Sequence, residues 1–112
     1  MRANTTKAKR GKPPLDSDAL LDNAHRTSEF LKALSHESRL AILCLLLEGE
    51  KTVGDIEEVL KLRQSTVSQQ LARLRADDFV KMRRNGKNVY YSVERPEVIE
   101  VMSALYRCFC KS

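Results

Sequence analysis

The sequence predicts a mainly α-helical fold with a two-stranded β-hairpin just before its last helix. Apolar residues recur every three or four positions between residues 18 and 76 and again after residue 96, which is typical of amphipathic helices. Between residues 79 and 93 the apolar period changes to two, and Asn85-Gly86 in the middle is a strong hairpin signal. With 112 residues, 42% hydrophobic and 31% charged, the chain has the size and composition of one globular domain.

Two helices are predicted in the first half of the chain. The first starts at about Asp18, and its apolar stripe is Leu20, Ala24, Thr27, Leu31 and Leu34. The second is predicted to run from His36 to Leu47, with Ser35 as its N-cap and Gly49 just beyond its end. Because this second helix is apolar on nearly every side, we expect it to be buried.

Two shorter segments follow that also have helical signals. Thr52-Val53-Gly54-Asp55 fits a capping box, so a third helix is predicted to begin there and to run to about Leu60. After a turn over residues 61–64, a fourth helix is predicted from about Ser65 to Ala76. Its inward face is Val67, Leu71 and Leu74, and its outward face carries Ser65, Thr66, Ser68, Gln69, Ala72 and Arg73.

The end of the chain is predicted to form the hairpin and a closing helix. The strands are expected at residues 79–83 and 88–93, with residues 84–87 as the connection. Pro96 suits the first turn of the last helix. The apolar stripe of that helix is Val98, Val101, Met102, Leu105 and Phe109.

Basic charge is concentrated in two segments. Residues 1–15 are interpreted as a disordered basic arm, because they are rich in Lys, lack aromatic and acidic side chains, and include Pro13-Pro14. Residues 16–112 are interpreted as the folded domain. Within it, residues 61–87 contain eight basic and two acidic side chains, whereas residues 15–60 contain four basic and ten acidic ones. Such a polarised domain turns one face towards a polyanion.

Several function classes are excluded by the sequence. The longest apolar run, Leu40 to Leu47, has eight residues, far fewer than the roughly 20 that a membrane-spanning helix needs. No apolar segment follows the basic N-terminus, so we expect no secretory signal and no membrane partner. An odd count of three cysteines indicates thiols in a reducing, cytoplasmic location. No catalytic constellation is evident, and two isolated histidines make no zinc site, so we expect neither an enzyme nor a cofactor or metal.

The predicted order of elements is that of a winged helix-turn-helix. In that arrangement the second helix of the pair enters the major groove of DNA and the hairpin lies along the backbone. Arg73 suits guanine and Gln69 suits adenine, whereas short hydroxyls near a helix N-terminus seat a phosphate. We therefore expect a double-stranded DNA partner. Its predicted contacts are Gln64 just before the fourth helix, then Ser65, Thr66, Ser68, Gln69 and Arg73 in that helix, and Arg83, Arg84 and Lys87 at the hairpin tip.

Three stretches resemble ArsR/SmtB-type bacterial repressors. They are Leu31-Lys-Ala-Leu-Ser-His-Glu-Ser-Arg-Leu-Ala-Ile-Leu43, then Gln64-Ser-Thr-Val-Ser-Gln-Gln-Leu-Ala-Arg-Leu-Arg75, and then Phe79-Val80 with Tyr90-Tyr91-Ser92. The resemblance spans residues 18–110. It implies a homodimeric winged-helix repressor of operator DNA whose first and last helices form the dimer interface. The chain departs from the pattern at Arg63, where many members of the family have a Ser that caps the recognition helix.

The cysteines determine which branch of this family the chain resembles. The third helix lacks the Cys-x-Cys pair of the heavy-metal sensors, and the last helix lacks the His ligands of the zinc sensors. Cys44 and Cys110 match the pair of the persulfide-responsive, SqrR/BigR-like branch. That resemblance implies that reactive sulfur species are the inducer: they link the two thiols by a disulfide or polysulfide bridge, and the repressor leaves its operator. Cys108 is an additional thiol, and two residues along a helix place it about 200° away from Cys110.

Two alternatives remain open at this point. The three thiols of Cys44, Cys108 and Cys110 are also soft ligands that suit a thiophilic metal or metalloid sensor. Alternatively, Cys44 is an inert core residue, because free cysteine is among the most buried residue types. The chain is then a non-sensing winged-helix module, either an architectural DNA-binding protein or an adaptor.

Overall fold

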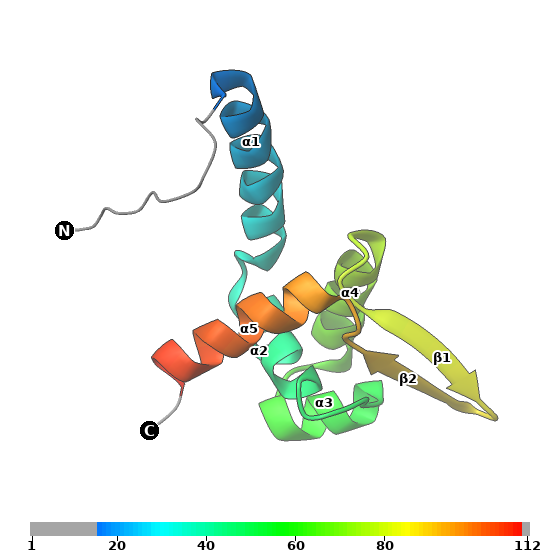
Figure 1. The fold of residues 1–112 in the computed structure, drawn as a ribbon. Coiled ribbons are helices and arrows are strands. Elements are labelled where there is room, and N and C mark those ends of the chain that lie inside the picture. The colour runs from blue at the N-terminus through cyan, green and yellow to red at the C-terminus, as the bar shows by residue number, and fades with distance from the viewer. Residues whose placement is uncertain (1–15, 111–112) are drawn as a thin grey trace. The chain divides into compact units, whose positions relative to one another are not determined.

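A computed structural model describes residues 16–110, which form five helices and one β-hairpin (Figure 1). In chain order these elements are α1 (Ser17–Leu34), α2 (Glu37–Leu46), α3 (Val53–Leu60), α4 (Gln64–Ala76), β1 (Lys81–Asn85), β2 (Asn88–Ser92) and α5 (Pro96–Phe109). The order is the predicted one. The chain comprises two compact units, residues 1–31 and 32–112. The predicted arm, residues 1–15, lies outside the described residues.

The first unit is described by most of α1, which is amphipathic. Its leucines point out of the helix with much of their surface exposed: 50% for Leu20, 69% for Leu21 and 53% for Leu31. Because burying a leucine stabilises a protein by about 1.5–3 kcal/mol, these three side chains leave a favourable contact unmade in the single chain. The expected role of α1 in a dimer stays a prediction.

The second unit is built around α2, which packs against α3, α4 and α5. Its side chains Ile42 and Leu43 are fully buried, as its all-round apolar sequence predicts. Further fully or nearly fully buried side chains come from the neighbouring helices and from the segment that links α4 to β1, among them Ile56, Val67, Leu71, Leu74, Phe79, Val80, Val98 and Met102. The predicted inward face of α4 is therefore confirmed.

The predicted N-cap of α2 is wrong by one residue. His36, and not Ser35, caps the helix: its backbone is extended, and its Nδ1 accepts a hydrogen bond from the Ser38 backbone N–H at 3.1 Å. Ser35 is instead part of the link from α1, where its N–H donates to the carbonyl of Lys32. The helix also ends at Leu46, one residue earlier than predicted.

The two helices of the helix-turn-helix, α3 and α4, differ in how their N-termini are capped. The capping box at the start of α3 is confirmed, with Thr52 N–H to Asp55 Oδ2 at 3.0 Å and Asp55 N–H to Thr52 Oγ1 at 3.1 Å. Lys61, in the left-handed region at φ 57°, ends α3. In contrast, α4 begins at Gln64 with Arg63 in the N-cap position and no side-chain cap. The missing Ser at residue 63 thus leaves backbone N–H groups of the first turn without a side-chain acceptor.

The hairpin is shorter than predicted and starts later. Phe79 and Val80 are buried core residues and not strand residues, because their backbone turns out of α4 before Lys81 pairs with Ser92. The ladder ends at the Asn85–Asn88 pair, so Gly86 and Lys87 alone form the turn. Gly86 has φ +67°, a conformation that favours glycine, which explains its place there.

The last helix, α5, packs on α2 with one face and leaves the other exposed. Pro96 occupies its first turn, as predicted, and Val98 and Met102 are buried. The predicted apolar stripe continues to Phe109, which is 81% exposed, and Ile99 and Tyr106 are exposed as well. Across residues 16–110, none of the helices combines the length and the apolar character needed to cross a membrane.

Candidate DNA interface and cysteine pair

The outward face of α4 presents the side chains predicted to contact DNA. Gln64, Ser65, Ser68, Gln69 and Arg73 are exposed, and Thr66 is half-buried. They occupy one side of the helix because Val67, Leu71 and Leu74 anchor the other side in the core. Arg73 lies 3.4 Å from Asp77 at the end of the helix, but its side chain stays 58% exposed. An exposed pair of this kind is weak, so the guanidinium remains available to a partner.

The hairpin divides the predicted basic residues into two classes. Arg84 and Lys87 are exposed near the turn, and among residues 16–110 neither forms a salt bridge with a carboxylate. Arg83 is different. Its Nε donates to both carboxylate oxygens of Glu50, at 2.9 and 3.2 Å, and its guanidinium lies 4.7 Å from the centre of the Tyr90 ring. Arg83 is thus engaged within the chain, whereas Arg84 and Lys87 are free to meet phosphate.

Glu50 and Arg83 join the hairpin to the loop that follows α2. The hydrogen bonds between these two side chains are the largest cause of both pKa shifts: they lower the pKa of Glu50 and raise the pKa of Arg83. Beside them, Lys51 and Tyr91 exchange two backbone hydrogen bonds, at 3.0 and 2.8 Å. The hairpin is therefore fixed to the segment between α2 and α3 by a bidentate ion pair and by an isolated β-bridge.

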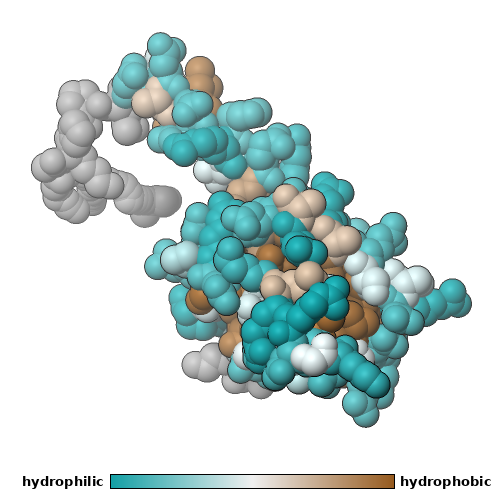
Figure 2. Space-filling model, turned by 90° about the vertical axis from the view of Figure 1, so that its right-hand side faces the viewer, coloured by the Kyte–Doolittle hydropathy of each residue, from teal (hydrophilic) through white to brown (hydrophobic). Residues whose placement is uncertain are grey.

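The face around the hairpin is polar. Figure 2 views the molecule from the side towards which the hairpin extends in Figure 1, and hydrophilic side chains cover most of that face. This distribution agrees with the excess of basic residues in the segment 61–87, which supplies both α4 and the hairpin.

The structure brings Cys44 of α2 and Cys110 together, although they are far apart in sequence. Cys110 directly follows α5 and is exposed, whereas Cys44 is partly buried. Burial is the largest cause that raises the pKa of the Cys44 thiol, followed by the electrostatic influence of the neighbouring Cys110 side chain. The two thiols therefore lie near enough to influence each other, and this influence favours the protonated form of Cys44.

Cys108 lies apart from this pair. It is exposed on α5, and the side chain that influences the pKa of Cys44 is that of Cys110 and not that of Cys108. This agrees with the expectation from helical geometry that only one of the two C-terminal cysteines faces α2. Two thiols therefore meet here, and the third points elsewhere.

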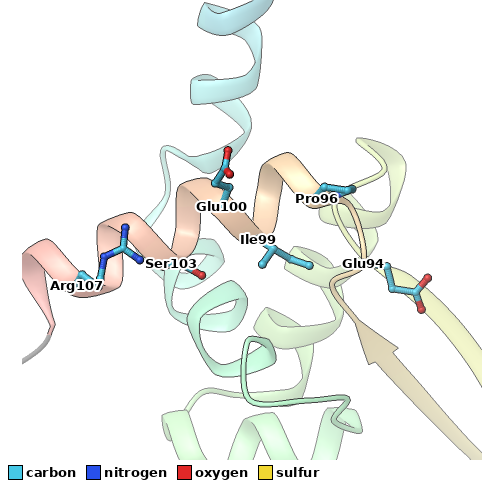
Figure 3. Close-up of a pocket in the computed structure, with 6 residues that line it drawn as sticks. All are labelled: Glu94, Pro96, Ile99, Glu100, Ser103 and Arg107. Atoms are coloured by element: carbon cyan, nitrogen blue, oxygen red, sulfur yellow. The ribbon is translucent and has the colours of Figure 1, made fainter.

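An open groove of about 530 Å³ follows α5 but does not include the cysteine pair. Its lining residues are Glu94, Pro96, Ile99, Glu100, Ser103 and Arg107 (Figure 3). The two carboxylates are its only candidate metal ligands, and no group of three or more His, Cys, Asp or Glu suited to a metal ion occurs among residues 16–110. The groove thus offers polar and apolar surface but no cluster of soft ligands.

Two contacts of the site have no counterpart in the sequence interpretation. The first is the pairing of Arg83 with Glu50. The second is a hydrogen bond from the buried Arg39 of α2 to Gln70 of α4. One signal was present for the second contact: an arginine at the start of an otherwise apolar helix must find acceptors if the helix is buried.

Comparisons with known proteins agree with this geometry. Residues 36–82 match the family model described as "Bacterial regulatory protein, arsR family". The chain is 36% identical over 110 residues to the "Biofilm growth-associated repressor" of Xylella fastidiosa (strain Temecula1 / ATCC 700964), covering 98% of this chain and 91% of that protein. It is also 36% identical over 99 residues to the "Transcriptional activator HlyU" of Vibrio cholerae serotype O1, covering 88% and 92%.

Solved structures give the same assignment. The crystal structure of the transcriptional repressor BigR from Xylella fastidiosa matches with a TM-score of 0.80 and 37% identity, over 85% of this chain and 94% of that one. Reduced HlyU from Vibrio cholerae N16961 matches with a TM-score of 0.80 and 37% identity, over 84% and 99%. These relatives are regulators and not enzymes, as expected for this chain. The fold, the two sequence motifs and these likenesses together place the chain in the arsR family of bacterial regulatory proteins.

Proposed function

We propose that this chain is a homodimeric repressor that binds operator DNA and is released when reactive sulfur species join Cys44 to Cys110. The observation that carries the sensing step is the nearness of these two thiols, one on α2 and one at the end of α5, through which Cys110 raises the pKa of Cys44. A direct disulfide needs Cα atoms within about 7 Å, and two neighbouring thiols on packed helices favour such a closure. One of the relatives is named a repressor and another is named an activator, so repression by this chain is itself part of the proposal.

The DNA contact is assigned to α4 and to the hairpin tip. The exposed Gln69 and Arg73 carry donors that reach base edges, and Arg84 and Lys87 supply charge for the backbone. A dimer places two such helices about 34 Å apart, in successive major grooves. The exposed apolar side chains of α1 and α5, such as Leu21 and Phe109, support a dimer that covers them.

The bridging chemistry proceeds in two steps, with a hydropersulfide R–S–SH as oxidant. The Cys110 thiolate attacks the outer sulfur, the S–S bond breaks, R–S⁻ leaves, and Cys110 carries a persulfide. Cys44 then loses its proton to water, and its thiolate attacks Sγ of Cys110 and expels HS⁻. Two protein thiols lose two electrons in all, and one sulfane sulfur is reduced to hydrogen sulfide. If Cys110 carries a longer sulfur chain, attack on an outer atom leaves extra sulfur in the bridge.

The order of these steps follows from exposure. Cys110 meets dissolved oxidant directly, whereas burial both shields Cys44 and raises its pKa. Cys110 is thus the thiol that reacts first with the dissolved oxidant, and Cys44 is the thiol that closes the bridge. The bridge ties α2 to α5, and because α2 also packs against α4, the recognition helix is biased away from the geometry that fits the groove.

The test compares DNA affinity before and after sulfur treatment. The probe is a duplex selected from a random-sequence pool by the reduced protein, and the oxidant is sodium tetrasulfide. Fluorescence anisotropy is expected to show a Kd that rises about 5- to 150-fold on treatment and recovers with dithiothreitol. An unchanged Kd contradicts the sensing role. Release by arsenite or Zn²⁺ in place of tetrasulfide favours the thiophilic metal sensor, and release by none of them favours a non-sensing module.

A further inference from the structure

Arg39 of α2 is a charged side chain that is buried in the second unit. It is 8% exposed and is the only charged or polar residue among residues 16–110 that is buried. Its Nε donates to the carbonyl oxygen of Ala33, in the last turn of α1, at 2.7 Å. That carbonyl is one of those that a helix end leaves without a partner in the helix, and Arg39 satisfies it.

The other arm of the same guanidinium reaches the recognition helix. Arg39 Nη1 donates to Oε1 of Gln70 at 3.0 Å, and Gln70 is half-buried in α4. Gln70 directly follows Gln69 and lies one turn before Arg73, two of the exposed side chains assigned to base contacts. The position of Gln70 therefore fixes how α4 presents its outward face.

This hydrogen bond is directional in a way that the surrounding apolar contacts are not. The contacts between the buried apolar side chains of α2 and α4 have no preferred direction. A guanidinium is a planar fork that stays charged, and breaking its bond to Gln70 leaves a partly buried donor without an acceptor. If α2 is displaced, α4 must therefore move with it for the Arg39–Gln70 hydrogen bond to stay intact.

The same helix also receives the sulfur signal. Cys44 lies five residues after Arg39 on α2, about 7.5 Å along the helix axis and about 140° around it. One end of α2 thus carries the thiol that lies near Cys110, and the other end carries the guanidinium that bonds to Gln70 of α4. A short helix transmits a shift at one end to the other because its backbone hydrogen bonds keep it rigid.

We propose that the Arg39–Gln70 hydrogen bond is the link that carries the bridging of Cys44 and Cys110 to the recognition helix, and that Arg39 and Gln70 are positioning residues for DNA release. This inference rests on the proposed sensing function. It predicts that the link controls the response to sulfur, measured as the ratio of Kd in the bridged state to Kd in the reduced state, and does not merely stabilise the fold.

The test uses the full chain with Gln70→Met, which removes the acceptor at nearly unchanged volume, and Gln70→Glu as the matched variant that keeps one. Each reduced protein is checked by circular dichroism, and complete Cys44–Cys110 bridging is checked by mass spectrometry after tetrasulfide treatment. Anisotropy with the selected duplex then gives the Kd ratio. We expect Gln70→Met to lower this ratio about 2- to 30-fold relative to the parent. Gln70→Glu should keep the parent ratio, because each variant is compared with its own reduced form.

Arg39→Lys provides a second route if Gln70→Met does not fold. Lysine keeps the charge but lacks the fork that reaches Ala33 and Gln70 together, so the ratio should fall here as well. A parent ratio in the folded Gln70→Met or Arg39→Lys protein overturns the inference and leaves the sensing function intact. If the parent itself shows no change in Kd after complete bridging, the proposed function fails instead.

Discussion

Serine in place of Cys44 or of Cys110 should abolish release by tetrasulfide while leaving DNA binding by the reduced protein near that of the parent. A serine hydroxyl is close in size to a thiol but forms no bond to sulfur, so neither variant closes the bridge. The parent is expected to lose about 5- to 150-fold in affinity, and each variant is expected to lose less than about twofold. Cys44 belongs to α2 and Cys110 follows α5, so neither is part of the proposed recognition helix α4. The DNA affinity of the reduced variants should therefore be largely unaffected.

Cys108→Ser is the matched control for this experiment. It removes a thiol from the same helix, two residues from Cys110, but Cys108 takes no part in the interaction with Cys44. It should therefore respond to tetrasulfide like the parent. Release of the Cys44→Ser or Cys110→Ser protein by tetrasulfide contradicts the assignment of the pair. Loss of response in Cys108→Ser indicates that the three thiols act together, as a soft-metal site requires.

Bridge closure should accelerate steeply with pH. The pKa of Cys44 is raised, first by burial, which persists after Cys110 has reacted. Cys44 is therefore almost fully protonated at neutral pH, and the fraction of its reactive thiolate grows about tenfold for each pH unit below the pKa. We expect the rate of the closing step to rise about 100-fold between pH 6 and pH 8. Quenched-flow mass spectrometry, which follows loss of the persulfide on Cys110, measures this rate.

The control for the pH series is the Cys44→Ser protein, in which only the first step on Cys110 takes place. Its pH profile is subtracted from that of the parent, so that ionisation of the oxidant and of Cys110 does not enter the comparison. A closing rate that becomes constant well below pH 8 contradicts a raised pKa of Cys44. In that case the nucleophile of the second step is a thiol with a lowered pKa.

The features that local sequence patterns determine were predictable. The inward face of α4, the capping box of α3 and Pro96 at the start of α5 depend on residues within about one or two helical turns of each other, and all three are confirmed. Phe79 and Val80 were assigned to a strand because their apolar character fits one. They are instead core residues that follow the turn at Asp78, which has φ 63°, and a buried residue after a turn is apolar just as a buried strand residue is.

The polar contacts that shape the site depend on tertiary structure. Arg83 and Glu50 are 33 residues apart, and Arg39 and Gln70 are 31 residues apart, so no local pattern pairs them. Arg83 had the residue type and the position of a phosphate contact, but the nearby carboxylate of Glu50 engages it. The meeting of Cys44 with Cys110 was inferred from a family resemblance, since helical geometry alone shows only that Cys108 and Cys110 face different ways.

The central claim is that the sulfur atoms of Cys44 and Cys110 within one subunit can be joined. Peptide mapping by mass spectrometry, after tetrasulfide treatment of the native protein and alkylation of free thiols, tests this directly. The account predicts one dominant crosslinked pair of peptides that contain Cys44 and Cys110, with the mass of a disulfide or of a bridge longer by whole sulfur atoms. Mixing isotopically light and heavy protein before treatment distinguishes crosslinks within a subunit from those between subunits. Dominant crosslinks through Cys108, crosslinks between subunits, or oxidised but unlinked Cys110 would contradict it.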